Sequence, residues 1–224
     1  MCGRIRLTVP WDVLARLYRF EHADPVDLPP RLNISPAQSI PIVRLSDGRR
    51  GLNLVRWGLV PRSARDAKVG NKMFNARLET LAERSVFRAP LAKRRCLVLA
   101  DAFYEWKVEG RRKIPYVVRT PEAAPFAMAG LWESWTSAEG EVVESCTIVT
   151  HPAVGDVATI HARMPVVLDP GAHDTWLDAR ERGGAHLVEL LSMSARTAFA
   201  VERIAAVPGD AASTPKGKQL RLFD

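Results

Sequence analysis

Two consecutive strands are predicted by residues 97–107, which read Leu97-Val98-Leu99-Ala100-Asp101-Ala102-Phe103-Tyr104-Glu105-Trp106-Lys107. The first four residues are all apolar, as expected for a central strand that is buried on both faces. The chain continues from Asp101 into a second strand, which ends at a turn formed by Glu109-Gly110. We therefore expect a β-sheet at the centre of the protein.

Short strands separated by turn signals recur on both sides of this pair. Further strands are predicted at residues 39–45, 51–60, 113–119, 126–132, 144–150 and 164–168. Short helices are predicted at residues 10–20, 80–88, 174–180 and 186–193, and an exposed loop at residues 62–72. This pattern predicts an α+β fold: a single domain built on a mostly antiparallel, barrel-like β-sheet with short flanking helices. We place the domain at residues 1–207 and expect residues 208–224, which are small, polar and Lys-bearing, to form a flexible C-terminal tail.

The composition favours an acidic partner. The chain of 224 residues has a formal net charge of +7 and a sequence pI near 9.7, and arginine dominates its basic residues. Arginine is suited to bidentate recognition of phosphate, so nucleic acid is one partner that this charge fits. We find no P-loop, dinucleotide-binding pattern or metal-ligand motif, and we expect neither a small-molecule cofactor nor a metal ion. Nothing in the sequence demands a dimer, so we expect a monomer.

The three cysteines divide into two classes. Cys96 and Cys146 lie in apolar runs and are predicted to be core thiols, and no paired spacing indicates a disulfide framework or a zinc site. No leader or membrane-spanning run is recognisable, so we expect a cytoplasmic protein with no membrane partner and with Cys2 as the mature N-terminus. Cys2 is therefore the cysteine with chemical interest.

Removal of Met1 would give Cys2 a free α-amine beside its thiol. The amine has a reference pKa of about 8 and the thiol of about 8.5, so modest help makes either group reactive near neutral pH. Such a 1,2-aminothiol condenses with an aldehyde: the amine forms a Schiff base, and the thiol then closes a five-membered thiazolidine. It can also act as an N-terminal nucleophile on an acyl group. The alternative is that Met1-Cys2 is a start codon followed by an incidental small residue.

Polar residues in unusual contexts suggest further groups for chemistry. Asn75 and Arg77 would face the same side of an extended segment and could hold a substrate oxygen and a phosphate, or they could form an Asx turn with a surface arginine. Glu105 lies among aromatic residues, where desolvation would raise its pKa, but the alternation of the strand also allows it to face solvent. His161 precedes an apolar strand and is either an acid–base group or a structural histidine.

Aromatic and basic side chains also alternate in two segments. Trp57 follows Arg56, and Trp106 precedes Lys107. Stacking faces beside phosphate-binding charges are typical of a site for single-stranded nucleic acid, although the two tryptophans could equally belong to the core.

Six segments taken together resemble the SOS-response-associated peptidase (SRAP) family. In chain order they are Met1-Cys2-Gly3-Arg4, Asn33-Ile34-Ser35-Pro36, Arg56-Trp57-Gly58-Leu59-Val60-Pro61, Asn75-Ala76-Arg77-Leu78-Glu79-Thr80, Asp101-Ala102-Phe103-Tyr104-Glu105-Trp106 and Ile160-His161-Ala162-Arg163-Met164-Pro165. The resemblance extends from residue 2 to about residue 200. It implies a compact, mainly β domain that shields abasic sites in single-stranded DNA. The shielding would be a covalent thiazolidine between Cys2 and the ring-opened sugar aldehyde, with lyase-like chemistry.

The resemblance also implies roles for individual residues. Cys2 would be the nucleophile, Asn75 would position its amine and the sugar, Glu105 would shuttle protons, and His161 would bind the opened sugar or adjoining phosphate. The residues that it implies for DNA binding are Arg4, Arg77 and Arg163, which would hold phosphates, and Pro36, Trp57, Trp106 and Thr150, which would line the strand groove.

This chain departs from the family pattern in two places. Arg62-Ser63 stands where many members carry a tryptophan, which leaves a base-stacking wedge there in question, and the segment from Val201 lacks the asparagine-rich ending common in the family. Two other functions stay open at this stage. One is a Cys2-dependent thiol peptidase that cleaves its own or another chain, and the other is a noncovalent single-strand binder in which Cys2 is incidental.

Overall fold

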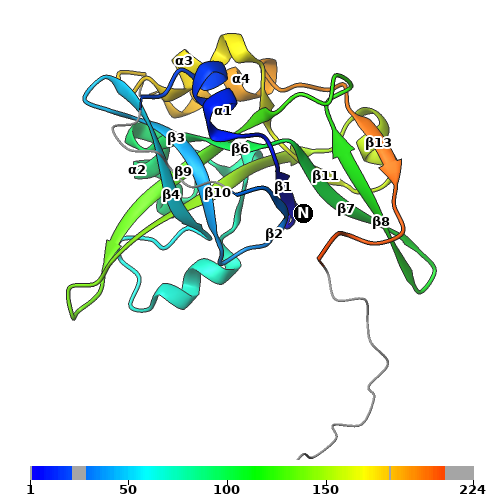
Figure 1. Ribbon diagram of the computed structural model, residues 1–224. Helices are drawn as coiled ribbons and strands as arrows, with labels where there is room; N and C mark the ends of the chain where they lie inside the picture. The colour runs from blue at the N-terminus through cyan, green and yellow to red at the C-terminus, as the bar shows by residue number, and fades with distance from the viewer. Residues whose placement is uncertain (1, 22–28, 182, 210–224) are drawn as a thin grey trace, which may run out of the picture.

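Five strands close into a β-barrel in the computed structural model, which describes residues 2–21, 29–181 and 183–209 (Figure 1). Around the ring each strand is paired with the next, and the last pairs with the first: β4 (Arg49–Trp57), β3 (Ser39–Ser46), β6 (Arg95–Ala100), β9 (Phe126–Thr136) and β10 (Val142–Pro152). Four of these pairings are antiparallel, and β10 with β4 is parallel. The apolar runs predicted from the sequence fill its interior, and all six residues of β6 are buried. The predicted mostly antiparallel, barrel-like α+β fold is therefore confirmed.

A second, five-stranded sheet lies against one side of the barrel. Its strand order is β13 (Ala200–Arg203), β8 (Arg112–Arg119), β7 (Ala102–Glu109), β1 (Ile5–Leu7) and β2 (Arg31–Ile34). Three short strands attach to the barrel: β5 (Asn75–Arg77) and β11 (Arg163–Pro165) pair with β10, and β12 (Val167–Leu168) pairs with β9. The chain passes from the barrel to the second sheet at Asp101, between β6 and β7.

The helices are short and lie outside the barrel. They are α1 (Trp11–Tyr18), α2 (Ser85–Lys93), α3 (His173–Leu177) and α4 (Gly184–Met193), and in Figure 1 α1, α3 and α4 gather at one end of the molecule. Among the described residues no helix is long and apolar enough to cross a membrane. Cys96 and Cys146 are buried free thiols, as their apolar surroundings predicted. The predicted tail falls mostly on residues 210–224, which lie outside the described residues.

Several predicted boundaries are wrong, among them those of one strand and one helix. The strand predicted at residues 51–60 ends at Trp57, because Gly58 adopts a φ of 133° and approaches Gly70 so closely that a Cβ would lie 2.5 Å from the Gly70 carbonyl oxygen. The helix predicted at residues 80–88 begins only at Ser85, because β5 stays extended to Arg77 and a 3₁₀ turn then reverses the chain. The loop predicted at residues 62–72 contains a 3₁₀ helix (Ala67–Lys72).

Candidate active site and nucleic-acid interface

The N-terminal segment is fixed beside β7 by a buried carboxylate. Asp101 is 2% exposed, and its side chain accepts hydrogen bonds from the Arg6 guanidinium and from the backbone N–H and the hydroxyl of Thr8. The backbone N–H of Tyr104 then donates to the carbonyl oxygen of Arg4 at 2.9 Å. These bonds hold β1 in register with β7. The residues that precede β1 therefore lie next to Glu105.

The register shows how close this approach is. Ile5 pairs with Phe103, and the hydrogen bond from Tyr104 to Arg4 continues this antiparallel arrangement before β1 begins, so Gly3 lies near Glu105. Cys2, the next residue, is fully buried. Burial raises the pKa of the Cys2 thiol, and the neighbouring Glu105 carboxylate raises it further. The thiol therefore holds its proton in this structure rather than existing as a thiolate.

Asn75, on a strand that pairs with the barrel, contacts the backbone of Cys2. Strand β5 runs parallel to β10, and from it the Asn75 side-chain amide donates a hydrogen bond to the Cys2 carbonyl oxygen at 2.7 Å. The Asn75 Oδ1 atom is buried and accepts no hydrogen bond within the described part of the chain. Since a buried amide oxygen without a donor is unfavourable, this atom is available to a donor that enters the site. The extended geometry, rather than the Asx turn, is what the structure shows for this segment.

Glu105 and His161 lie beside each other and are the candidate acid–base groups of the site. The Glu105 side chain is 3% exposed, and its Oε1 atom lies 3.8 Å from Nδ1 of His161. Burial raises the pKa of the Glu105 carboxyl, and His161 offsets part of that rise. His161 is held by the backbone of Arg163, because its Nδ1 atom lies 2.8 Å from the carbonyl oxygen and 3.0 Å from the N–H of that residue. The inward orientation of Glu105 follows from the alternation of β7, in which Phe103 also faces the main core.

Four residues predicted from different parts of the chain thus converge. Cys2, Asn75, Glu105 and His161 come from the segment before β1, from β5, from β7 and from the segment before β11, and the contacts above link them. The arrangement combines a thiol next to the chain terminus, an amide that fixes the backbone beside it, and two groups that can exchange protons. No group of three or more His, Cys, Asp or Glu residues with the geometry of a metal site occurs in the described residues.

Two of the predicted groove residues are buried instead. Trp57 and Thr150 are both 0% exposed. The Trp57 indole N–H donates to the Phe74 carbonyl oxygen at 2.9 Å, and the Thr150 hydroxyl lies 3.4 Å from the Ala76 carbonyl oxygen. In this structure neither side chain presents a surface to a DNA strand. Both are parts of the packing that holds β5 in place.

The predicted phosphate-binding arginines differ in their availability. Arg77 is exposed and makes no ion pair within the described residues. Arg4 donates to the Asn33 side-chain oxygen at 3.1 Å. Arg163 is already engaged, because its guanidinium donates to the Glu79 carboxylate and to the Thr150 carbonyl oxygen, the latter at 2.6 Å. Arg77 is thus the arginine of the three that is best placed to accept a new phosphate.

Pro36 and Trp106 are half-buried and remain predictions as groove residues. Trp106 follows Glu105 in β7 and points to the opposite face, where it packs with Ile204 on a small cluster of Ala102, Tyr104, Val117 and Val207.

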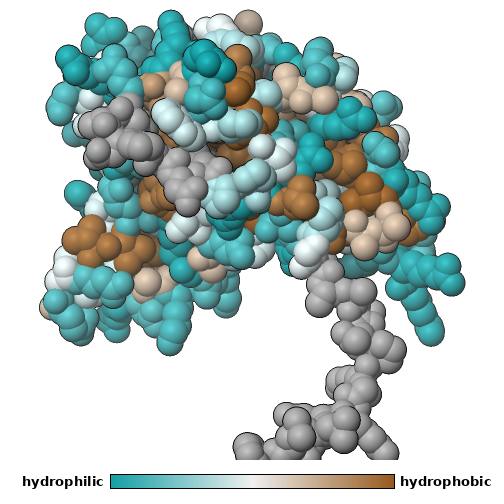
Figure 2. Space-filling model, in the orientation of Figure 1, coloured by the Kyte–Doolittle hydropathy of each residue, from teal (hydrophilic) through white to brown (hydrophobic). Residues whose placement is uncertain are grey.

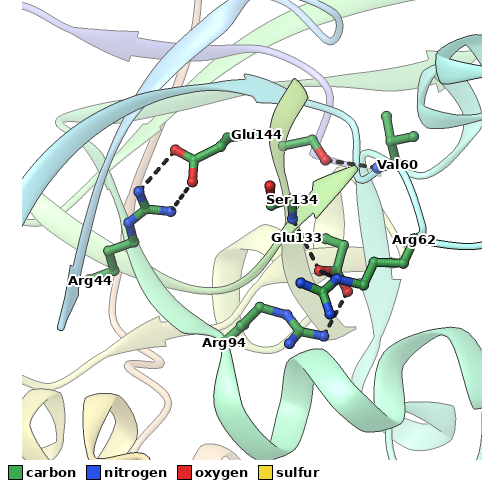
Figure 3. A network of polar contacts seen from close by, with 8 residues as sticks. Arg44, Val60, Arg62, Arg94, Glu133, Ser134 and Glu144 are labelled. Carbon is green, nitrogen blue, oxygen red and sulfur yellow. Dashed lines mark hydrogen bonds and ion pairs between the residues drawn. The ribbon is translucent and has the colours of Figure 1, made fainter. Parts of the chain in front are cut away.

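Arg62 takes part in an ion-pair network rather than in a stacking wedge. Glu133 is 3% exposed and forms ion pairs with two arginines (Figure 3). Its Oε2 atom lies 2.7 Å from a guanidinium nitrogen of Arg94, and its Oε1 atom lies 3.3 Å from Nε of Arg62. Arg44 of β3 forms a two-bond pair with Glu144 of β10, across the intervening strand β4. At this departure from the family pattern, the chain has a buried carboxylate held by two arginines.

Two residues that position the site were missed from the sequence. Asp101 fixes β1, and its only sequence signal is an acidic residue directly after a fully apolar strand. Glu79 engages Arg163 from a segment 84 residues away, and no local pattern indicates such a contact.

The fold and these motifs define the class of protein. The chain belongs to the SOS response associated peptidase (SRAP) family, whose model matches residues 1–207. It is 38% identical over 194 residues to the abasic site processing protein YobE of Bacillus subtilis, a match that covers 85% of this chain and 88% of YobE. It is 30% identical over 240 residues to the abasic site processing protein HMCES of Rattus norvegicus, with 85% of this chain and 68% of HMCES covered. A crystal structure of a protein from Bacteroides thetaiotaomicron has the same fold, with a TM-score of 0.79 at 24% identity over 91% of this chain and 92% of the other.

Proposed function

We propose that this protein acts in DNA repair by shielding abasic sites in single-stranded DNA through a covalent thiazolidine formed by Cys2 after removal of Met1. The observation that carries the proposal is the convergence of Cys2, Asn75, Glu105 and His161 in one buried site. The names of the relatives, which are abasic site processing proteins, support a role at such sites. An abasic sugar supplies the aldehyde that a 1,2-aminothiol requires.

The amine is the first nucleophile in this mechanism. Burial keeps the Cys2 thiol protonated, so the α-amine attacks the aldehyde carbon of the opened sugar and forms a carbinolamine. The carbinolamine hydroxyl then leaves as water when it receives a proton, which produces the Schiff base. Glu105 suits this step because its raised pKa lets it hold a proton at a higher pH than an ordinary carboxyl group.

The thiol completes the ring in the second stage. As Cys2 Sγ adds to the imine carbon, the S–H bond breaks and the imine nitrogen gains a proton, with the Glu105–His161 pair as the relay. The net reaction joins amine, thiol and aldehyde and releases one water. Asn75 holds the Cys2 carbonyl oxygen, which orients the amine, and its free Oδ1 atom can accept a hydrogen bond from that amine or from a sugar hydroxyl.

The same geometry weighs against a thiol peptidase, the alternative function. A cysteine peptidase needs a thiolate or a base that readily forms one, whereas burial and Glu105 both raise the pKa of the Cys2 thiol. The exposed Arg77 beside the site also serves a phosphate better than a peptide.

The test separates the roles of the amine and the thiol. Wild-type protein and Cys2→Ala are mixed with a single-stranded oligonucleotide that carries one abasic site, with and without borohydride. Wild-type protein should give an adduct that survives denaturation without reductant. Cys2→Ala retains an α-amine, so it should give an adduct only when borohydride reduces the Schiff base. A reductant-independent adduct with Cys2→Ala would contradict the thiazolidine.

A further inference from the structure

A cationic crevice lies at the outer end of the second sheet. Arg112 and Lys113 of β8 and Arg203 at the end of β13 line it, together with Ile114, Pro115, Ile204 and Ala205, and its volume is about 640 Å³. The three cations are exposed, none of the lining residues is acidic, and none of the three makes an ion pair within the described residues. Figure 2 shows hydrophilic side chains over the end of the β7–β8 hairpin, next to hydrophobic ones over the neighbouring strands.

Nearby carboxylates do not neutralise this crevice. Glu109, which is opposite Arg112 in the β7–β8 register, pairs with Lys107 at 3.4 Å. Glu202, the neighbour of Arg203, pairs with Arg119 at 3.5 Å. The positive charge of the crevice is therefore available to an anion from outside the described residues.

The strand register connects the crevice to the active site. Glu105 is opposite Tyr116, and Tyr116 is opposite Arg203, so the three residues form one row across β7, β8 and β13. Residues in such a row share a face of the sheet, and neighbouring strands are about 4.8 Å apart, which places the Arg203 backbone about 10 Å from that of Glu105. A strand that leaves the active site along this row reaches the crevice.

Trp106 lies near the cations, but it points to the face of the sheet opposite Glu105. Trp106 is opposite Pro115, which lines the crevice, and it packs on the same small cluster as Ile204. The guanidinium and ammonium groups are therefore the part of this region that can bind the phosphate of a strand leaving along the Glu105 row.

From this arrangement we infer that the cationic crevice binds a backbone phosphate of the single strand, a few nucleotides from the abasic sugar. The inference rests on the proposed function and adds to it Arg112, Lys113 and Arg203 as residues that extend the footprint of the DNA. If the crevice binds DNA, the rate of crosslinking depends on the length of the strand that flanks the abasic site, because a short oligonucleotide reaches Cys2 but not the crevice.

The experiment compares two oligonucleotides and two triple variants. One oligonucleotide has a single nucleotide on each side of the abasic site, and the other has about ten, enough to span a single-strand binding site. The variant Arg112→Ala/Lys113→Ala/Arg203→Ala removes the crevice cations. The control variant Arg16→Ala/Arg49→Ala/Arg180→Ala removes the same charge from exposed arginines that are paired with acidic residues elsewhere.

The crevice variant should crosslink the short oligonucleotide at the wild-type rate and the long one more slowly at subsaturating protein. For noncovalent binding of a long strand without an abasic site, the slope of log K against log salt should decrease in magnitude by about 0.7, the amount expected for the loss of one phosphate contact on a single strand. The control variant should keep the wild-type slope. Equal effects of the two variants, an unchanged slope, or an equal loss of rate on the short oligonucleotide would overturn the inference. Failure of the wild-type protein to crosslink either oligonucleotide would instead overturn the proposed function.

Discussion

Replacing Glu105 by glutamine should stabilise the protein and slow its reaction at the same time. The carboxyl is 3% exposed, and burial raises its pKa. The folded state therefore binds the Glu105 proton more tightly than the unfolded state does, so the wild type loses stability as pH rises from the ordinary pKa of about 4.3 through the raised one. Glutamine keeps the shape of the side chain but carries no charge to bury.

The magnitude follows from the linkage between proton binding and folding. Each pH unit by which the folded pKa exceeds the unfolded one corresponds to about 1.4 kcal/mol. The difference in the free energy of unfolding between Glu105→Gln and wild type should be small near pH 4, should increase in favour of the variant through the raised pKa, and should then level off. The rate of crosslinking should fall by about a hundredfold or more, as for the loss of a general acid–base group.

The assay is chemical denaturation of both proteins at a series of pH values that starts at about pH 4, near the ordinary pKa of a glutamate carboxyl, and extends into the alkaline range. The same pair is measured in a His161→Gln background, because His161 lies 3.8 Å from the carboxylate and its contact with Glu105 contributes to the difference. A difference that does not change with pH, or a variant that is less stable than wild type at high pH, would refute the reasoning.

Three further substitutions test other parts of the site. Asn75→Ala removes the amide that donates to the Cys2 carbonyl oxygen. The single-turnover rate constant for crosslinking should therefore fall at least tenfold, while the affinity for undamaged single strands stays constant. Arg163→Met leaves the Glu79 carboxylate and a buried carbonyl without their donor and should lower the free energy of unfolding by about 1–3 kcal/mol in urea denaturation; an unchanged value would show that the pair is not formed. Trp57→Phe removes a buried hydrogen bond and leaves a void, so it should lower the melting temperature with little effect on DNA affinity, and the opposite result would restore Trp57 to the DNA interface.

Local patterns were enough to predict the barrel. The apolar run of β6 identifies a strand whatever its partners are, because burial on both faces requires apolar residues, and the turn signal at Glu109-Gly110 marks the end of β7. The short strands β1, β2, β5 and β13 have no such signal, since three or four residues are too few to show a period and their pairing depends on distant partners.

The candidate site was predictable from its chemistry more than from its geometry. Cys2, Asn75, Glu105 and His161 were all named from residue type and motif, and the structure brings them together. The tryptophans show the limit of this reasoning, because Trp57 and Trp106 have similar sequence contexts but one is fully buried and the other half-buried. The difference arises from packing across the sheet, which the sequence does not display.

The central claim is that Cys2 joins DNA at an abasic aldehyde, and the intact mass of the wild-type protein tests it most directly. The protein is measured alone and after mixing with a single-stranded oligonucleotide that contains one abasic site, under denaturing conditions. We expect the free protein to lack Met1 and the mixture to contain a species with the mass of protein plus DNA minus one water. A chain that has lost Met1 and forms no such species would contradict the account.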